Sequence, residues 1–325
     1  MNPAGELGLA ARQLVTRGTQ VAGWAGSSAW AVLGTLSRGI RTVVRPAGVR
    51  GVALEAGVLV MHVVMYPWGV STEQRRPGDP CDCYRTDDLS PAKRGLVIAD
   101  VRAAGTPILL VHGFADNRSA FAVLGRALRK RGFGMVYGLN YSVLTALTGD
   151  VPSAARELDR KVERILEATG TEQVHVVGHS LGGLVARYYI QRLGGDARVH
   201  TLVTLGTPHL GTMAAYLLPT QVLRQMRPDS DVMAELAAPS PGCRTRFVSL
   251  WSELDMFVVP QRNARLDHPD LMVTNYLLSG VGHLSLLVDP RAVHMVASAL
   301  AQLDESPSAD MAAANPIGPL PTSAS

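Results

Sequence analysis

The chain has 325 residues, of which 47% are hydrophobic and 18% charged, and its formal net charge is +4. This length and composition suit one catalytic domain with a large buried core plus appendages. The arginines are spread along the chain without a nucleic-acid motif, so we expect no nucleic-acid partner. Three cysteines exclude a disulfide framework and a zinc site. The three cysteines are Cys81, Cys83 and Cys243. Two alternatives remain open: one of the first two forms a disulfide with Cys243, or all three are free thiols.

Residues 1–75 differ from the rest of the chain. They hold two uncharged runs, 21–37 and 56–72, each slightly shorter than the roughly 20 apolar residues of a bilayer span. Between the runs lie Arg38, Arg41, Arg45 and Arg50. One interpretation is peripheral membrane contact through an anchor or helical hairpin, and the other is a pair of apolar helices packed on the catalytic domain. Because no convincing cleavage site follows the first run, we expect a membrane-associated or cytoplasmic protein rather than a secreted one.

After an exposed linker at 76–103, strand and helix patterns alternate through residues 104–303, and a Pro, Ala and Ser-rich tail at 304–325 is expected to be disordered. The pattern predicts strands at 106–113, 134–141, 174–177, 199–205, 246–250 and 272–278, and helices at 119–131, 152–168 and 289–303. The predicted fold class is α/β, with a mostly parallel sheet covered by helices on both faces. Ligands then bind at the carboxyl ends of the strands.

The segment Gly178-His179-Ser180-Leu181-Gly182 follows a β-branched strand and passes directly into a helical pattern. In a Gly-x-Ser-x-Gly motif of this context, a sharp turn presents the serine hydroxyl above the sheet. We therefore predict Ser180 as a nucleophile. The alternative is an ordinary strand-to-helix turn with a capping serine.

A serine hydroxyl needs a base to take its proton, and that base needs an acid to orient it. His283 fits the base best, because it follows a strand late in the chain within a glycine-flanked loop. Other histidines fit less well, because His294 is expected to be packed in a helix, His268 precedes a strand and His209 suits a structural hydrogen bond. Asp255 follows the strand at 246–250 and is the predicted acid, with Glu253 as its rival.

The negative oxygen formed during acyl transfer needs two backbone donors. We predict the N–H of Leu181, directly after the nucleophile, and the N–H of Phe114, in the loop after the strand that ends at His112-Gly113.

These motifs, together with Gly206-Thr207-Pro208-His209, resemble those of bacterial triacylglycerol-lipase-like esterases of the α/β-hydrolase superfamily, and the actinobacterial ones most. The resemblance covers about residues 104–303, with the motifs in family order. It implies Ser180, Asp255 and His283 as a catalytic triad, with Phe114 and Leu181 as the oxyanion hole. Some bacterial lipases bind calcium near the histidine loop, but here only Asp289 stands near, so we expect no metal and no cofactor.

An insertion at 210–243 carries apolar helical stretches that suit a cap over a fatty acyl substrate. The alternative is a fixed cap that only completes the core. We therefore expect a serine carboxylic-ester hydrolase that acts on lipid or fatty-acyl esters. Two further functions remain open, namely an acyltransferase with the same triad and a non-catalytic lipid-binding membrane scaffold.

Overall fold

The computed structural model describes residues 55–57, 105–114, 116–139 and 149–301. Except for residues 55–57, the predicted N-terminal apolar helices lie outside these ranges, as do the linker, the C-terminal tail, Cys81 and Cys83. Cys243 is a free thiol, and its sulfur donates to Asp196 Oδ1. None of the helices in the described ranges has both the length and the apolar character needed to cross a bilayer.

Six parallel strands form the centre of the described fold, in the order β2-β1-β3-β4-β5-β6. Their bounds are β1 Ile108–Val111, β2 Val136–Leu139, β3 Val174–His179, β4 Val199–Leu205, β5 Arg246–Trp251 and β6 Met272–Leu277. Each strand lies within one residue or two of its predicted range, because the β-branched runs are bounded by glycine, proline or polar residues. The predicted α/β-hydrolase fold with a parallel sheet is therefore confirmed.

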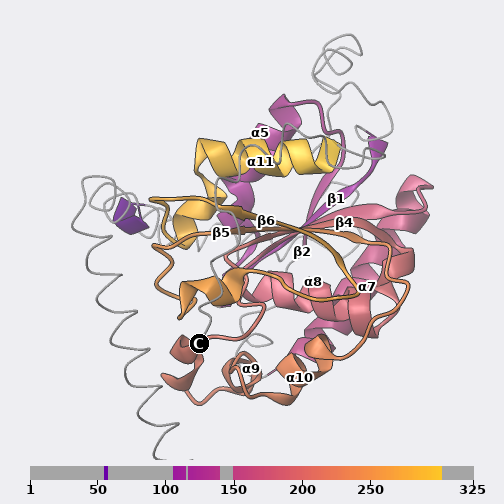
Figure 1. Cartoon of the computed structure of the whole chain (residues 1–325). Helices are drawn as coiled ribbons and strands as arrows, with labels where there is room; N and C mark the ends of the chain where they lie inside the picture. The colour runs from indigo at the N-terminus through magenta and orange to yellow at the C-terminus, as the bar shows by residue number, and fades with distance from the viewer. Residues whose placement is uncertain (1–54, 58–104, 115, 140–148, 302–325) are drawn as a thin grey trace, which may run out of the picture. The chain divides into compact units, whose positions relative to one another are not determined.

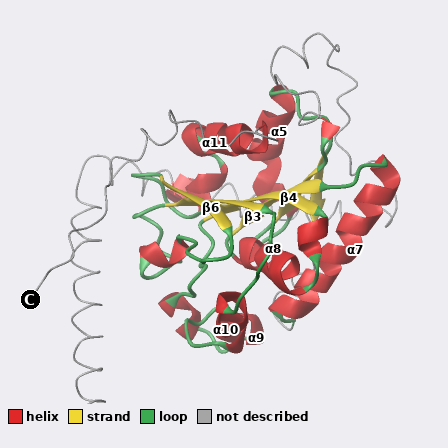
Figure 2. Cartoon of the chain, turned by 45° about the vertical axis from the view of Figure 1, so that its right-hand side comes forward, coloured by secondary structure: helices red, strands yellow, loops and turns green. Residues whose placement is uncertain are grey.

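Helices cover both faces of this sheet (Figure 1). Helices α7 (Val151–Thr169) and α8 (Leu181–Arg192) pack on one face, and α5 (Ala122–Lys130) and α11 (Pro290–Ala301) on the other, as Figure 2 also shows. Alternate residues of β1 belong to the two cores, since Leu109 and Val111 pack toward α7 and α8 whereas Ile108 and Leu110 pack toward α5 and α11. Full burial of one such side chain contributes about 1.5–3 kcal/mol, so both layers stabilise the sheet that carries the site.

Helix α7 shows how local signals set the element ends. Asp150 caps it by accepting a hydrogen bond from Ser153 N at 2.6 Å, and Pro152 lies in its first turn. The helix ends at Gly170, whose φ of 69° is a left-handed conformation that glycine adopts without steric cost. The predicted ends of this helix, at Pro152-Ser153 and Gly170, are confirmed to within two residues.

The insertion after β4 contains three short helices, η4 (Met213–Tyr216), α9 (Gln221–Gln225) and α10 (Asp231–Ala237). A buried arginine links the insertion to α8, because Arg187 donates from Nη1 to the His209 carbonyl at 2.9 Å and from Nη2 to the Leu236 carbonyl at 2.8 Å. Burial, together with the nearby charge of Arg192, lowers the pKa of Arg187 to about 9. Neutral carbonyl partners hold this cation, so the insertion is fixed to α8 by directional contacts as well as by apolar packing.

Candidate active site

The site lies where the strand order reverses. Strand β1 pairs with β2 on one side and β3 on the other, so the loops that follow β1 and β3 leave the same edge of the sheet side by side. A Cβ atom added to Gly113, after β1, would lie 3.1 Å from Ser180 Cβ, after β3. Ligands of open α/β sheets bind at such a reversal point.

Ser180 sits in the turn between β3 and α8 with φ 53° and ψ −121°. It is the one non-glycine residue with positive φ among those the structure describes. Such a backbone conformation costs about 1–3 kcal/mol and persists only where the surroundings enforce it. Here the Ser180 N–H donates to the Leu205 carbonyl at 2.9 Å, and its carbonyl accepts from Gly183 N at 3.1 Å. The strained backbone of Ser180 agrees with the sharp turn predicted between this strand and helix.

The glycines beside Ser180 are required by close backbone contacts. A Cβ on Gly182 would lie 2.2 Å from the Val111 carbonyl oxygen, and one on Gly178 would lie 2.6 Å from Gly183 Cα. Side chains at these positions would push α8 away from β1 and β3. The motif therefore places the start of α8 against two strand ends.

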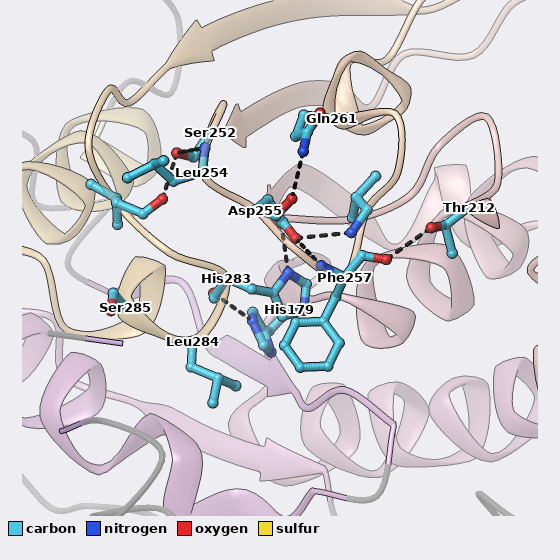
Figure 3. Close-up of polar contacts among 12 residues, drawn as sticks. His179, Thr212, Ser252, Leu254, Asp255, Phe257, Gln261, His283, Leu284 and Ser285 are labelled. Atoms are coloured by element: carbon cyan, nitrogen blue, oxygen red, sulfur yellow. Dashed lines mark hydrogen bonds and ion pairs between the residues drawn. The ribbon is translucent and has the colours of Figure 1, made fainter. Parts of the chain in front are cut away.

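Asp255 and His283 form a buried pair (Figure 3). Asp255 Oδ2 accepts from His283 Nδ1 at 2.6 Å. Asp255 Oδ1 accepts from two backbone N–H groups, those of Phe257 at 2.8 Å and Val258 at 2.9 Å, which fix the carboxylate in its turn. The rival acid, Glu253, instead accepts from Ser279 Oγ at 3.4 Å on the surface. The structure thus brings Asp255, and not Glu253, to the histidine.

Electrostatics at this pair favour a basic imidazole. Burial alone lowers the pKa of His283, but the charge and hydrogen bond of Asp255, with the charges of Glu55 and Asp116, raise it above 6.5 on balance. With Nδ1 engaged by Asp255, Nε2 is left to accept a proton from a nucleophile.

Two aromatic rings flank His283. The ring centroid of His179 lies 4.7 Å from that of His283, and the ring of Phe257 lies 4.9 Å away on another side. His179 Nε2 also lies 3.2 Å from the His283 carbonyl (Figure 3). Since Ser180 follows His179 directly, the turn of the serine contacts the histidine loop. Within the described residues no hydrogen bond joins the Ser180 hydroxyl to His283, and catalytic hydrogen bonds often tighten only when substrate binds.

The predicted oxyanion donors flank Ser180. Leu181 is the first residue of α8, and Phe114 follows Gly113, where an added Cβ would lie 3.1 Å from Ser180 Cβ. The two N–H groups therefore come from the two loops that meet at the reversal of strand order.

The three histidines that were weighed as rival bases lie elsewhere. His209 is buried with Nε2 2.9 Å from Thr204 Oγ1, and burial beside Arg187 lowers its pKa well below 6.5, so its contact is structural, as expected. His268 Nε2 lies 3.2 Å from the Ala238 carbonyl. The expectation that His294 is packed is wrong, because it is exposed on α11.

Asp289, the acidic residue near the histidine loop, has a structural role. Its Oδ1 accepts from Arg291 N at 2.8 Å at the start of α11, and its Oδ2 pairs with the Arg291 guanidinium at 3.0 Å. Across the described ranges, no group of three or more His, Cys, Asp or Glu side chains is placed to hold a metal ion.

Glu55 contacts the histidine loop, although no sequence motif pointed to it. Its carboxylate accepts hydrogen bonds from Leu284 and Ser285, directly after His283. The available signal was that Glu55 is the only acidic residue between positions 7 and 72 and borders the second uncharged run.

Comparisons with known proteins agree with this architecture. Residues 106–239 match the family described as alpha/beta hydrolase fold. A triacylglycerol lipase of Burkholderia plantarii is 34% identical over 129 residues, which are 37% of this chain and 35% of the relative. A triacylglycerol lipase of Pseudarthrobacter phenanthrenivorans is 34% identical over 122 residues, 35% of this chain and 37% of the relative. This chain thus matches about a third of the length of these curated relatives.

Among solved structures, lipase B of Aspergillus fumigatus is similar with a TM-score of 0.56 and 19% sequence identity, covering 66% of this chain and 57% of that one. At such low identity the likeness concerns the fold alone. With the strand order and the serine turn described above, these comparisons establish that the chain has the α/β-hydrolase fold.

Proposed function

We propose that this chain is a serine hydrolase that cleaves carboxylic esters of lipids through an acyl-enzyme intermediate. The observation that carries the proposal is the buried Asp255–His283 pair in contact with the strained turn of Ser180. A nucleophile, a base and an orienting acid, each following a parallel strand, are the parts that acyl transfer needs.

In the proposed mechanism, His283 Nε2 takes the proton of the Ser180 hydroxyl as its oxygen attacks the ester carbonyl. The N–H groups of Leu181 and Phe114 hold the oxyanion, and His283 returns the proton to the departing alcohol. Water then gives a proton to His283 and attacks the acyl-enzyme, which releases the fatty acid and restores Ser180. Asp255 keeps the imidazole oriented and stabilises its charged form in both halves of the cycle.

The surface around His283 supports an apolar acyl substrate. Met256 and Phe257 are 63% and 52% exposed directly after Asp255, and Leu217 in the insertion is 81% exposed. Three hydrogen bonds join these segments. Met213 N donates to the Val259 carbonyl and Thr212 Oγ1 to the Phe257 carbonyl, both at 2.8 Å, and Val259 N donates to Thr212 Oγ1 at 2.9 Å. Apolar side chains therefore extend from the ring that contacts His283 onto the insertion. Matched relatives named triacylglycerol lipases favour the same substrate class.

The test uses the purified full-length chain and p-nitrophenyl esters of increasing acyl length. Ser180→Ala and His283→Ala should each lower kcat by up to ~10⁶-fold with the fold retained, because triad members act as a unit. Turnover of Ser180→Ala close to that of wild type would refute the proposal.

The same protein separates the two rival functions. Product analysis with glycerol present distinguishes an acyltransferase, which would form glycerol esters, from a hydrolase, which releases free acid. A fluorophosphonate probe should label wild type and not Ser180→Ala. A well-folded wild type that no such probe labels would be a non-catalytic lipid-binding scaffold instead.

We propose in addition that residues 1–75 hold the enzyme at a membrane surface. The support is their two uncharged runs and the arginines between them, since apolar faces bind bilayers reversibly and basic residues add attraction to anionic lipid. Full-length protein should float with anionic vesicles. A variant with Arg38, Arg41, Arg45 and Arg50 replaced by glutamine should float less. Failure of the full-length protein to float would exclude the anchor.

A further inference from the structure

Glu55 contacts the loop of the candidate base from far away in the sequence. Its Oε1 accepts from Leu284 N at 2.8 Å, and its Oε2 accepts from Ser285 N at 2.9 Å and from Ser285 Oγ at 2.7 Å. The residues joined by the first bond are 229 positions apart. All three donors belong to the two residues that follow His283.

These bonds serve the start of a short helix. Leu284 and Ser285 begin η6 (Leu284–Leu287), and the N–H groups of a first turn lack partners within their own helix. His283 occupies the capping position but forms no side-chain cap, because its Nδ1 is bound to Asp255. Glu55 supplies the acceptors that His283 cannot supply.

Glu55 also packs against the residue before the histidine. A Cβ added to Gly282 would lie 2.3 Å from Glu55 Oε2 and 2.5 Å from its carboxyl carbon. Contact of the carboxylate therefore requires a glycine at this position. One side chain thus holds the backbone on both sides of His283, while Asp255 holds its ring.

We propose that Glu55 is a positioning residue for His283. The inference rests on the proposed function, because it assigns His283 as the base. Without Glu55, two N–H groups and the fully buried Ser285 hydroxyl lose their acceptors, and the loop shifts to find others. A shift of about 1 Å in a catalytic group can cost on the order of 10²-fold in rate.

The negative charge of Glu55 should affect the pH dependence of kcat/KM, which a purely structural role of this residue would leave unchanged. The charged groups that raise the pKa of His283 are Asp255, Glu55 and Asp116, in opposition to burial. His283 acts as a base only when neutral, so activity rises as pH passes its pKa. Removing the charge of Glu55 lowers that pKa, and the acid limb of the kcat/KM profile moves to lower pH.

The experiment measures kcat, KM and the pH profile on p-nitrophenyl butyrate for full-length Glu55→Ala, Glu55→Gln, Gly282→Ala and the double variant Glu55→Ala/Gly282→Ala. Glu172→Gln, at an exposed site before β3, is the matched control and should behave as wild type. We expect Glu55→Ala and Gly282→Ala each to lower kcat ~10–100-fold with KM little changed. Glu55→Gln keeps one acceptor oxygen, so it should lose less rate but still move the acid limb to lower pH.

The double variant tests the contact itself. Gly282→Ala acts by displacing the Glu55 side chain, so it should lower kcat little further in a chain that already lacks this side chain. The fold-losses of kcat in the two single variants should therefore not multiply in the double variant. The same non-additivity is expected in thermal unfolding, which requires no activity.

Three results would overturn the inference. If Glu55→Ala has the kcat of wild type while Ser180→Ala is inactive, Glu55 does not position His283, and the hydrolase proposal still stands. Losses of kcat that multiply in the double variant would show that Gly282→Ala does not act through its contact with Glu55. An acid limb in Glu55→Gln that coincides with that of wild type removes the influence of Glu55 on the base. An inactive wild type, by contrast, refutes the proposed function and the inference with it.

Discussion

His175 makes the described domain sensitive to acid. It is 0% exposed at the start of β3, and neither ring nitrogen has a hydrogen-bond partner among the described residues. Burial, with the charges of His200 and Arg246, lowers its pKa from 6.5 to about 3. The unfolded chain therefore binds a proton below pH 6.5, whereas the folded chain does not until about pH 3. The free energy of unfolding must fall as pH drops through that window.

The size of the effect follows from the two pKa values. Each pKa unit corresponds to about 1.36 kcal/mol, so between pH 7.5 and pH 4 the imidazole should remove about 3 kcal/mol of stability. Net stabilities are about 5–15 kcal/mol, so this is a large fraction. Replacing His175 by phenylalanine removes the titrating group and two unpaired nitrogens. We expect unchanged or slightly higher stability at neutral pH and a smaller loss in acid.

Urea unfolding followed by circular dichroism at about pH 7.5, 5.5 and 4 measures this loss. His175→Phe should retain part of the acid sensitivity, because His209 is also buried with a lowered pKa. His294→Gln, on the exposed surface of α11, controls for the loss of an imidazole and should follow wild type. If His175→Phe loses as much stability in acid as wild type, the reasoning from burial is refuted.

Three further predictions test the site and its surroundings. Asp255→Asn should lower kcat by ~10⁴-fold because the imidazole loses its orienting charge, whereas Glu253→Gln should keep a kcat near that of wild type. If Glu253→Gln lost more activity than Asp255→Asn, Glu253 would be the catalytic acid instead. Gly182→Ala, whose Cβ would meet the Val111 carbonyl, should cost about 1–3 kcal/mol in unfolding experiments and most of the esterase activity. Joint replacement of Leu217 and Leu218 by serine should spare turnover of p-nitrophenyl butyrate and lower hydrolysis of emulsified triolein, and equal loss on both substrates would contradict a lipid-contacting role.

The sheet could be predicted from the sequence because its signals are local. Strand patterns such as Val174–His179 alternate with helix patterns along most of the domain, and alternation of this kind leaves few topologies open. Ser180, Asp255 and His283 each follow a strand, so parallel strands bring them to one edge. Their proximity could therefore be predicted, while their catalytic roles, and the narrower likeness to actinobacterial enzymes, stay predictions.

The long-range polar contacts of Arg187 and Glu55 could not be predicted. Arg187 lies in an otherwise apolar stretch of α8, and its acceptors, the carbonyls of His209 and Leu236, become visible only once the insertion is folded. Glu55 binds the histidine loop through a carboxylate that no motif connects to it. Periodicity indicates which face of an element is buried, but not which distant backbone groups a buried charge will find.

The strand order has a consequence for synthesis of the chain on the ribosome. Strands β3, β4, β5 and β6 add to one edge of the sheet in sequence order, so each new strand finds its neighbour already made. The turn of Ser180 is synthesised well before His283, since 104 positions separate His179 from His283. At about 5–20 residues per second, translation of that interval takes about 5–20 s. During this time the nascent chain has the turn of Ser180 without Asp255 and His283, so a chain that works by the proposed mechanism would not cleave esters until the domain is complete.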